Sequence, residues 1–141
     1  SEYGVWPAAY VGLTALRAAT LTGDPALRAW GLAVATAQRA TPPPAGLPMP
    51  AMDAGLALQL FAEAFVQTGD ERWLADGRTL AGQLLPLFFE PDRALPRGAA
   101  GIDWYESQMG PGFLLHGLAR LALLTLHGAA QCPLAGNYTA R

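Results

Sequence analysis

Apolar residues recur at mixed intervals of three and four along most of the chain, which is the spacing of an amphipathic helix. The first such run covers residues 6–21. It ends in a Thr-Gly-Asp-Pro turn at residues 22–25, where Gly23 suits a left-handed helix end and Asp24 suits the cap of a new helix. Proline is favoured in the first helical position, so a second helix is predicted over residues 25–39.

The same signal returns further along the chain. Helical spacing fills residues 52–67, and the Thr-Gly-Asp turn at residues 68–70 lies 46 residues after its first copy. A fourth helix is predicted over residues 71–85 and a fifth over residues 112–126. A repeat of about this length is typical of stacked helix pairs. The pattern therefore predicts two helical hairpins followed by the first helix of a third.

The connections between the predicted helices alternate in length. Turns within a hairpin are short, whereas residues 41–53 and 90–111 are long and rich in Pro and Gly. This alternation is typical of an (α/α) toroid, in which the long loops gather on one face together with residues 1–7. We expect an all-α fold, a partial (α/α) toroid of about five main helices over residues 1–127, either whole or a fragment of a larger toroid. A plain antiparallel bundle is the alternative, and residues 128–141 are expected to form an irregular tail.

The fifth predicted helix is apolar nearly all round. Such a helix must be covered by other parts of a protein. Its expected outer partner is not in the repeat, so we expect a homo-oligomer or a missing partner domain to cover it. The apolar residues are Phe113, Leu114, Leu115, Leu118, Leu121, Leu123, Leu124 and Leu126.

Composition and charge exclude several classes of protein. The formal net charge is −2, so no basic field is available to hold nucleic acid. All nine basic residues are Arg, which excludes chemistry that needs a lysine amine. With one Cys and two His, no cluster of metal ligands is expected, and no glycine motif indicates a nucleotide cofactor. No apolar run reaches the length of a membrane span.

Several segments resemble one family of carbohydrate-active proteins. Residues 3–12, together with the helix ending in Thr22-Gly23-Asp24, are similar to the inner-helix pattern of the C-terminal toroid domain of D-glucuronyl C5-epimerases. Residues 77–87 look like the Gly-x-x-x-Leu…Leu-Pro segment of that family, and residues 103–108 lie where it has an aromatic-Tyr motif. The chain departs from the family at Ala54, where the family has Asn, and at Glu106, where it has His. Sugar 2-epimerases, unsaturated uronyl hydrolases and uronate lyases share the Thr-Gly-Asp turn.

The polar cluster Asp103-Trp104-Tyr105-Glu106 directly precedes the fifth helix. An epimerase needs a base that removes the proton beside the sugar carboxylate and an acid that returns one to the other face. Tyr105 and Glu106 are the candidates for these roles, while Trp104 can stack on a sugar and Asp103 can bind hydroxyl groups. The alternative is that Asp103 and Glu106 cap the helix and that Tyr105 packs in the core.

Five further residues are candidates for the same site, each with a structural alternative. Arg97 has a planar guanidinium suited to a uronate carboxylate, or it is a solvated loop residue. Asp53 can bind substrate or cap the third helix. His116 can act as an acid or base, or it is a hydrogen-bonded core residue. Trp6 and Tyr10 can form a sugar platform, or they belong to the core.

The sequence and the resemblance together predict a domain that acts on uronate-containing glycans. The resemblance implies an isomerase, a uronyl epimerase that transfers protons between two bases without a cofactor. A non-catalytic helical module that binds a glycan or a protein is one alternative, and a toroid uronyl hydrolase or lyase is another. Neither the substrate nor the cellular compartment follows from the residues.

Overall fold

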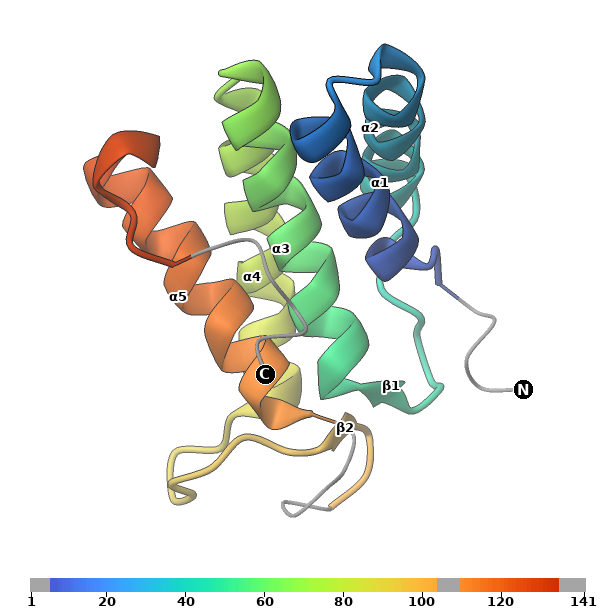
Figure 1. Cartoon of the computed structure of the whole chain (residues 1–141). Helices are drawn as coiled ribbons and strands as arrows, with labels where there is room; N and C mark the ends of the chain where they lie inside the picture. The colour runs from blue at the N-terminus through green and yellow to red at the C-terminus, as the bar shows by residue number, and fades with distance from the viewer. Residues whose placement is uncertain (1–5, 104–109, 135–141) are drawn as a thin grey trace.

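The computed structural model describes residues 6–103 and 110–134, and within them it is all-α apart from one short sheet, as predicted (Figure 1). The candidates Trp104, Tyr105 and Glu106 lie outside the described residues. The elements, in chain order, are α1 (Ala9–Thr22), α2 (Pro25–Ala40), β1 (Met49–Pro50), α3 (Ala51–Thr68), α4 (Arg72–Phe88), β2 (Ala99–Ala100), α5 (Pro111–His127) and a 3-10 turn (Ala129–Gln131).

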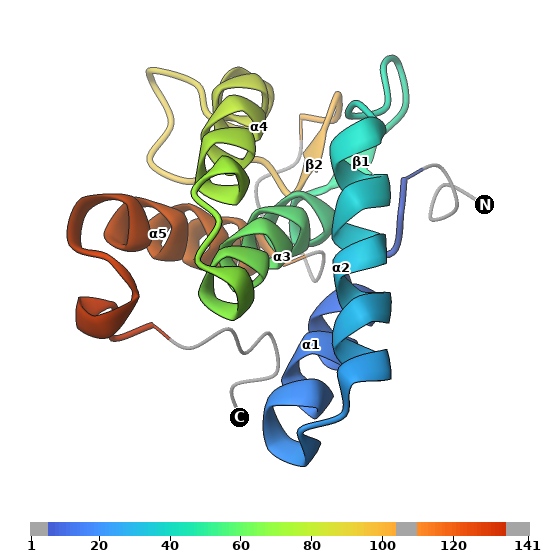
Figure 2. The same cartoon turned by 90° about the horizontal axis from the view of Figure 1, so that it is seen from above.

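Helix α3 is the centre of the molecule. It packs against α1 on one side and α5 on the other, and α2 and α4 lie in a second layer behind this row (Figures 1 and 2). Its residues from Ala54 to Ala64 are all buried, because every side of the helix has a neighbour. The odd-numbered helices all begin at the end of the molecule where β1 and β2 lie (Figure 1).

The two Thr-Gly-Asp turns form the tight ends of the hairpins, as the repeat predicts. Gly23 and Gly69 close α1 and α3 in the left-handed conformation, with φ of 72° and 70°. Asp24 Oδ1 then accepts a hydrogen bond of 2.8 Å from the Ala26 N–H, and Asp70 Oδ1 accepts one of 3.0 Å from the Arg72 N–H. Side-chain capping thus satisfies one free N–H at the start of each of α2 and α4.

Helix α4 is longer than predicted. The helix predicted over residues 71–85 ends too early, because the helix continues through Pro86 to Phe88. Proline disfavours a helix interior because it lacks the N–H that bonds to the carbonyl four residues earlier, but here only two helical residues follow it, so little of the helix lies beyond the lost bond. Phe88 is fully buried, and its burial offsets the cost of the proline.

The two long loops meet at one end of the bundle. Met49 and Pro50 pair with Ala100 and Ala99 in an antiparallel register, and the Ala51 N–H donates a 2.9 Å hydrogen bond to the Gly98 carbonyl. The expectation that these loops share a face is confirmed for their described parts. This face lies at the start of α3. The loops therefore lie beside the N-terminal ends of α1, α3 and α5, which we call the inner row (Figure 1).

Helix α5 buries one side against α3 and exposes part of the other. Leu114, Leu121 and Leu124 are almost completely buried, whereas Leu115 is 45% exposed and Leu126 is 73% exposed. No segment within residues 6–103 and 110–134 covers that outer side as α2 covers α1 and α4 covers α3. None of the described helices is both long and apolar enough to cross a membrane.

Candidate functional site

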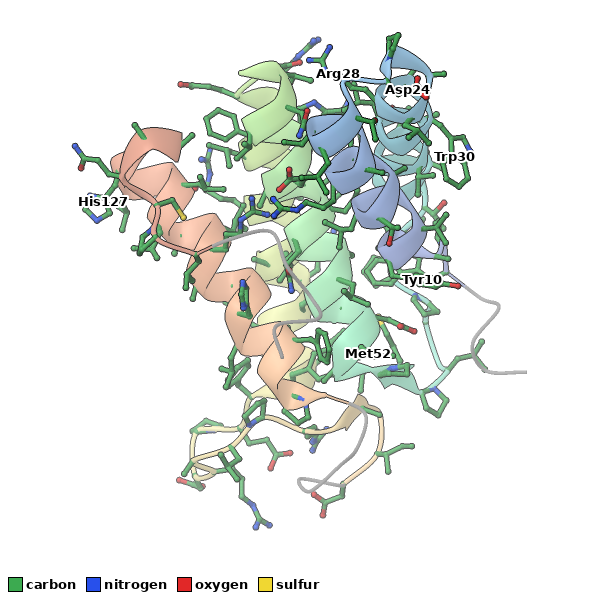
Figure 3. The ribbon with its side chains drawn as sticks, in the orientation of Figure 1. Tyr10, Asp24, Arg28, Trp30, Met52 and His127 are labelled. Atoms are coloured by element: carbon green, nitrogen blue, oxygen red, sulfur yellow. The ribbon has the colours of Figure 1, made fainter. Side chains whose placement is uncertain are left out.

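Three of the residues predicted to bind substrate line one pocket. Trp6, Tyr10 and Asp53 surround a cavity of about 250 Å³ between the first turns of α1 and α3. Figure 3 shows Tyr10 and Met52, another lining residue, on facing parts of these two helices. Tyr10 is 52% exposed, so its ring is available to a ligand. Tyr10 is therefore not a core residue, which was the structural alternative for it.

Trp6 is held in a defined position at this pocket. Its indole N–H donates a 3.0 Å hydrogen bond to the carbonyl of Thr41, the residue that follows α2. When the buried Gln38 amide is oriented to match its neighbours, its nitrogen donates to the Pro7 carbonyl at 3.1 Å and its oxygen accepts from the Trp6 indole at 2.9 Å. These bonds fix one edge of the indole and leave its faces for packing or stacking.

Asp53 occupies the first turn of α3 without serving as its cap. The N-cap position belongs to Pro50, and no side chain caps this helix. Burial raises the pKa of the Asp53 carboxyl above its ordinary value of 3.8, because removal from water disfavours the charged form. Within the described parts of the chain the carboxyl has no hydrogen-bond or ion-pair partner, so its oxygens are available to a ligand.

The N-terminal ends of α1, α3 and α5, the inner helices, have backbone N–H groups that no side chain among the described residues caps. By contrast, the side chain of Asp24 caps α2. Ala8 and Ala9 at the start of α1 also line the pocket. Uncapped N–H groups and the positive end of the helix dipole favour a negatively charged group. The pocket thus combines aromatic rings, one carboxyl and backbone donors.

We expect Asp53→Asn to stabilise the folded protein more at pH 7 than at pH 3. The pKa of Asp53 is higher in the folded state than in the unfolded chain. Its contribution to stability is therefore full below the unfolded pKa of 3.8 and is lost as the pH rises through the folded pKa. Asparagine does not titrate, so it avoids this loss. Urea unfolding followed by circular dichroism at both pH values measures the difference, and an equal effect at the two values would contradict it.

The other candidate residues lie elsewhere. Arg97 forms an ion pair with Glu90 on its own loop, and its backbone N–H donates to the Phe88 carbonyl at 2.8 Å, so it fastens the loop to the end of α4. It does not line the pocket of Trp6. His116 is half-buried on α5 and also lies outside this pocket. Asp103 is exposed three residues after β2, at the end of the molecule where the pocket lies.

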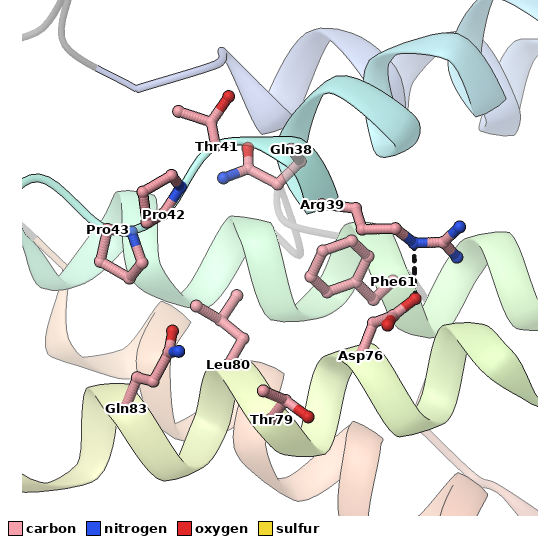
Figure 4. Close-up of a pocket in the computed structure, with 10 residues that line it drawn as sticks. All are labelled: Gln38, Arg39, Thr41, Pro42, Pro43, Phe61, Asp76, Thr79, Leu80 and Gln83. Carbon is pink, nitrogen blue, oxygen red and sulfur yellow. Dashed lines mark ion pairs between the residues drawn. The ribbon is translucent and has the colours of Figure 1, made fainter.

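A second groove lies between α2 and α4, on the outer layer (Figure 4). The Arg39 Nε forms an ion pair of 2.6 Å with Asp76 Oδ2, and the Arg39 guanidinium lies 3.9 Å from the centre of the Trp73 ring. Trp73 in turn stacks on Phe61 at 6.0 Å. These contacts bridge two helices that have little direct contact, which indicates a structural role.

A buried ion pair joins α3 to α5, and the candidates drawn from the sequence do not include it. Glu63 Oε2 lies 2.6 Å from Arg120 Nη2, and the side chains are only 9% and 4% exposed. Each residue interrupts an apolar stretch of its helix, and that interruption is the signal that could have revealed the pair. The pair lines a further pocket of about 230 Å³ together with Arg17 and Gln67.

Comparisons of the chain with protein-family models, with curated proteins and with solved structures give no match. Within residues 6–103 and 110–134, no three side chains of His, Cys, Asp or Glu gather in a way that could hold a metal ion. The geometry of the pockets is therefore the basis for a functional assignment.

Proposed function

We propose that this domain binds a uronate-containing glycan in the pocket of Trp6, Tyr10 and Asp53 and acts on it as a uronyl epimerase. The observation that carries the proposal is the pocket itself, which is lined by aromatic and acidic residues from the start of two inner helices. Binding sites for small polar molecules combine apolar walls with a few fixed polar groups, and this pocket has both.

Each part of the pocket matches one part of a uronate sugar. The rings of Trp6 and Tyr10 offer flat apolar surfaces to the C–H face of the sugar. The Asp53 carboxylate accepts hydrogen bonds from sugar hydroxyl groups. The uncapped N-terminal ends of α1 and α3 offer N–H donors to the sugar carboxylate. Arg97 has no part in this proposal, because Glu90 holds its guanidinium.

The proposed reaction is a proton exchange at the carbon beside the carboxylate. A base removes that proton, the electron pair moves into the carboxylate, and an acid returns a proton to the opposite face of the ring. Tyr105 and Glu106 are the proposed pair. A Cβ at Gly110 would lie 3.3 Å from Cβ of the pocket residue Met52. Tyr105 precedes Gly110 by five positions in the sequence and lies outside the described residues.

We also propose that the two layers form part of an (α/α) toroid. The arrangement that supports this is the parallel row of α1, α3 and α5 with α2 and α4 behind it (Figure 2). A further hairpin or a second copy of the chain would then cover the exposed Leu115 and Leu126 of α5. The presence of such a hairpin or second copy over α5 is a prediction.

A non-catalytic glycan-binding module is the second candidate function. The observation that favours it is the composition of the pocket, which has two aromatic rings but only one titratable carboxyl among its described lining residues. An epimerase needs two groups that exchange protons, whereas a binding module needs only the rings and hydrogen bonds. Both candidate functions therefore predict that the protein binds the glycan, but only the epimerase predicts turnover.

The proposal predicts deuterium incorporation at the carbon beside the carboxylate when glucuronate oligosaccharides are incubated with the protein in D₂O. NMR spectroscopy measures the exchange. Tyr105→Phe should reduce its rate by about 10²-fold or more, because general acid–base groups contribute about that much. Tyr10→Phe is the matched control: it loses the same hydroxyl, keeps the stacking ring and should retain turnover.

Binding of the same oligosaccharides should fall about tenfold in Trp6→Ala, a free-energy loss of about 1.4 kcal/mol. Isothermal titration measures this. Binding without exchange would support the glycan-binding module, and absence of both binding and exchange would overturn the proposal.

A further inference from the structure

The pocket around the Glu63–Arg120 pair lies at the opposite end of the inner row from the pocket of Trp6. Asp53 and Glu63 are ten residues apart on α3, which corresponds to about 15 Å along the helix axis. Helices α1, α3 and α5 and the segment after α5 all contribute to its walls. It is a separate cavity of about 230 Å³, so it needs its own explanation.

Arg120 is buried with most of its hydrogen-bonding capacity unused. Only Nη2 has a partner, the Glu63 carboxylate at 2.6 Å. Its Nε and Nη1 are buried and have no hydrogen-bond partner within residues 6–103 and 110–134. Leaving a buried polar group without a partner destabilises the folded state, and a charged group does so more strongly than a neutral one. Native proteins rarely accept this cost without a bound water, ion or ligand.

The neighbouring side chains do not supply the missing acceptors. Glu63 is already engaged through both oxygens, because its Oε1 accepts a 3.2 Å hydrogen bond from Gln67 Nε2. The same Gln67 amide nitrogen lies 2.5 Å from Thr20 Oγ1, and the Thr20 hydroxyl donates to the Leu16 carbonyl at 3.0 Å. In the structure, no described lining residue accepts a hydrogen bond from Nε or Nη1 of Arg120.

The charges around the cavity favour a negative acceptor over water. The lining residues include two arginines, Arg17 and Arg120, and one acid, Glu63, which leaves one positive charge in excess. Water satisfies donors but leaves this charge uncompensated, whereas an anion at the buried guanidinium of Arg120 supplies both acceptors and the opposite charge.

We propose that this cavity binds a small oxyanion, a carboxylate or phosphate, with Arg120 at its base and Arg17 at its mouth. The volume is several times the roughly 30 Å³ that one water occupies in the liquid, and it is smaller than pockets for drug-sized ligands. The ligand is thus a small acid or a single acidic group of a larger molecule. This site is independent of the proposed glycan pocket, since the two share no lining residue.

The test is an NMR titration of the whole ¹⁵N-labelled chain with sodium acetate and, separately, with sodium phosphate at constant ionic strength. Acetamide is the neutral control ligand, because it has nearly the shape of acetate and no charge. We expect saturable shifts of the amides of Thr20, Gln67 and Arg120 with at least one anion and none with acetamide. If the shifts saturate with acetate, the preferred group is a carboxylate; if they saturate with phosphate, it is a phosphate. Shifts confined to Tyr10 and Asp53 would belong to the other pocket and would count against this proposal.

Substitutions of individual arginines then show which positive charge contributes to anion binding. Arg17→Ala should weaken binding about three- to tenfold, while Arg78→Ala, which removes an exposed arginine from the outer helix α4, should leave it unchanged. The double variant Glu63→Gln/Arg120→Met leaves neither charge alone and should abolish binding. If circular dichroism shows that the double variant does not fold, the comparison of Arg17→Ala with Arg78→Ala decides. The proposal is overturned if neither anion saturates, if acetamide binds equally, or if Arg17→Ala binds as well as the unmodified chain.

Discussion

Gly55→Ala should destabilise the protein by about 3 kcal/mol or more, at the upper end of the cost of overpacking a core. A Cβ at Gly55 would lie 2.2 Å from the carbonyl carbon and oxygen of Phe113 and 2.4 Å from the Leu114 nitrogen. These are backbone atoms of α5, so no side chain can rotate away. Helix α5 would have to move as a whole, and α3 and α5 contact each other more extensively than any other pair of described helices.

Gly82→Ala is the matched control for this substitution. Gly82 lies in α4 on the exposed side, and a Cβ there would meet no atom within 4 Å. Alanine favours a helix over glycine, so Gly82→Ala should stabilise the protein by about 0.5–1 kcal/mol. Urea unfolding followed by circular dichroism measures both changes. Equal stability of Gly55→Ala and the unmodified protein would show that α3 and α5 do not approach so closely.

Arg120→Met should destabilise the protein by about 3–5 kcal/mol, because it leaves the Glu63 carboxylate buried without its ion-pair partner. A lone buried charge costs far more than a buried pair contributes, since the pair compensates the loss of water on both sides. Adding Glu63→Gln to Arg120→Met removes that charge and should recover most of the loss. Unfolding curves of the single and double variants give the coupling between the two sites.

Arg72→Met provides the corresponding measurement for an exposed pair. Arg72 lies 2.7 Å from Asp70, but the arginine side chain is 82% exposed. Its removal should destabilise the protein far less than removal of Arg120, because water replaces the lost partner. A similar cost for Arg72→Met and Arg120→Met would argue against the burial of the Glu63–Arg120 pair.

Helix positions were largely predictable because short-range signals determine them. A Thr-Gly-Asp turn combines a left-handed glycine with an aspartate cap, and both copies behave in the structure as the local rules predict. The end of α4 was not predictable in this way. Pro86 locally favours termination, and the burial of Phe88, a tertiary effect, overrides it.

The candidate site was predictable only in part. Trp6, Tyr10 and Asp53 lie at the starts of α1 and α3, and this placement brings them to one pocket. The guanidinium of Arg97 suits a uronate carboxylate, but it pairs with Glu90, and that pairing depends on how the loop folds back on α4. The position of a residue in the sequence shows which end of a bundle it occupies. It does not show which neighbour forms an ion pair with it.

The all-α class, the hairpin repeat and the end of the molecule where the long loops gather can all be predicted from the residues. They follow from periodicity, turn residues and connection lengths, all of which act over a few residues. The approach of Gly55 to the backbone of α5 and the pairing of Glu63 with Arg120 across 57 positions of sequence arise from tertiary packing. Such contacts depend on the rotation and spacing of packed helices, which many side chains determine together.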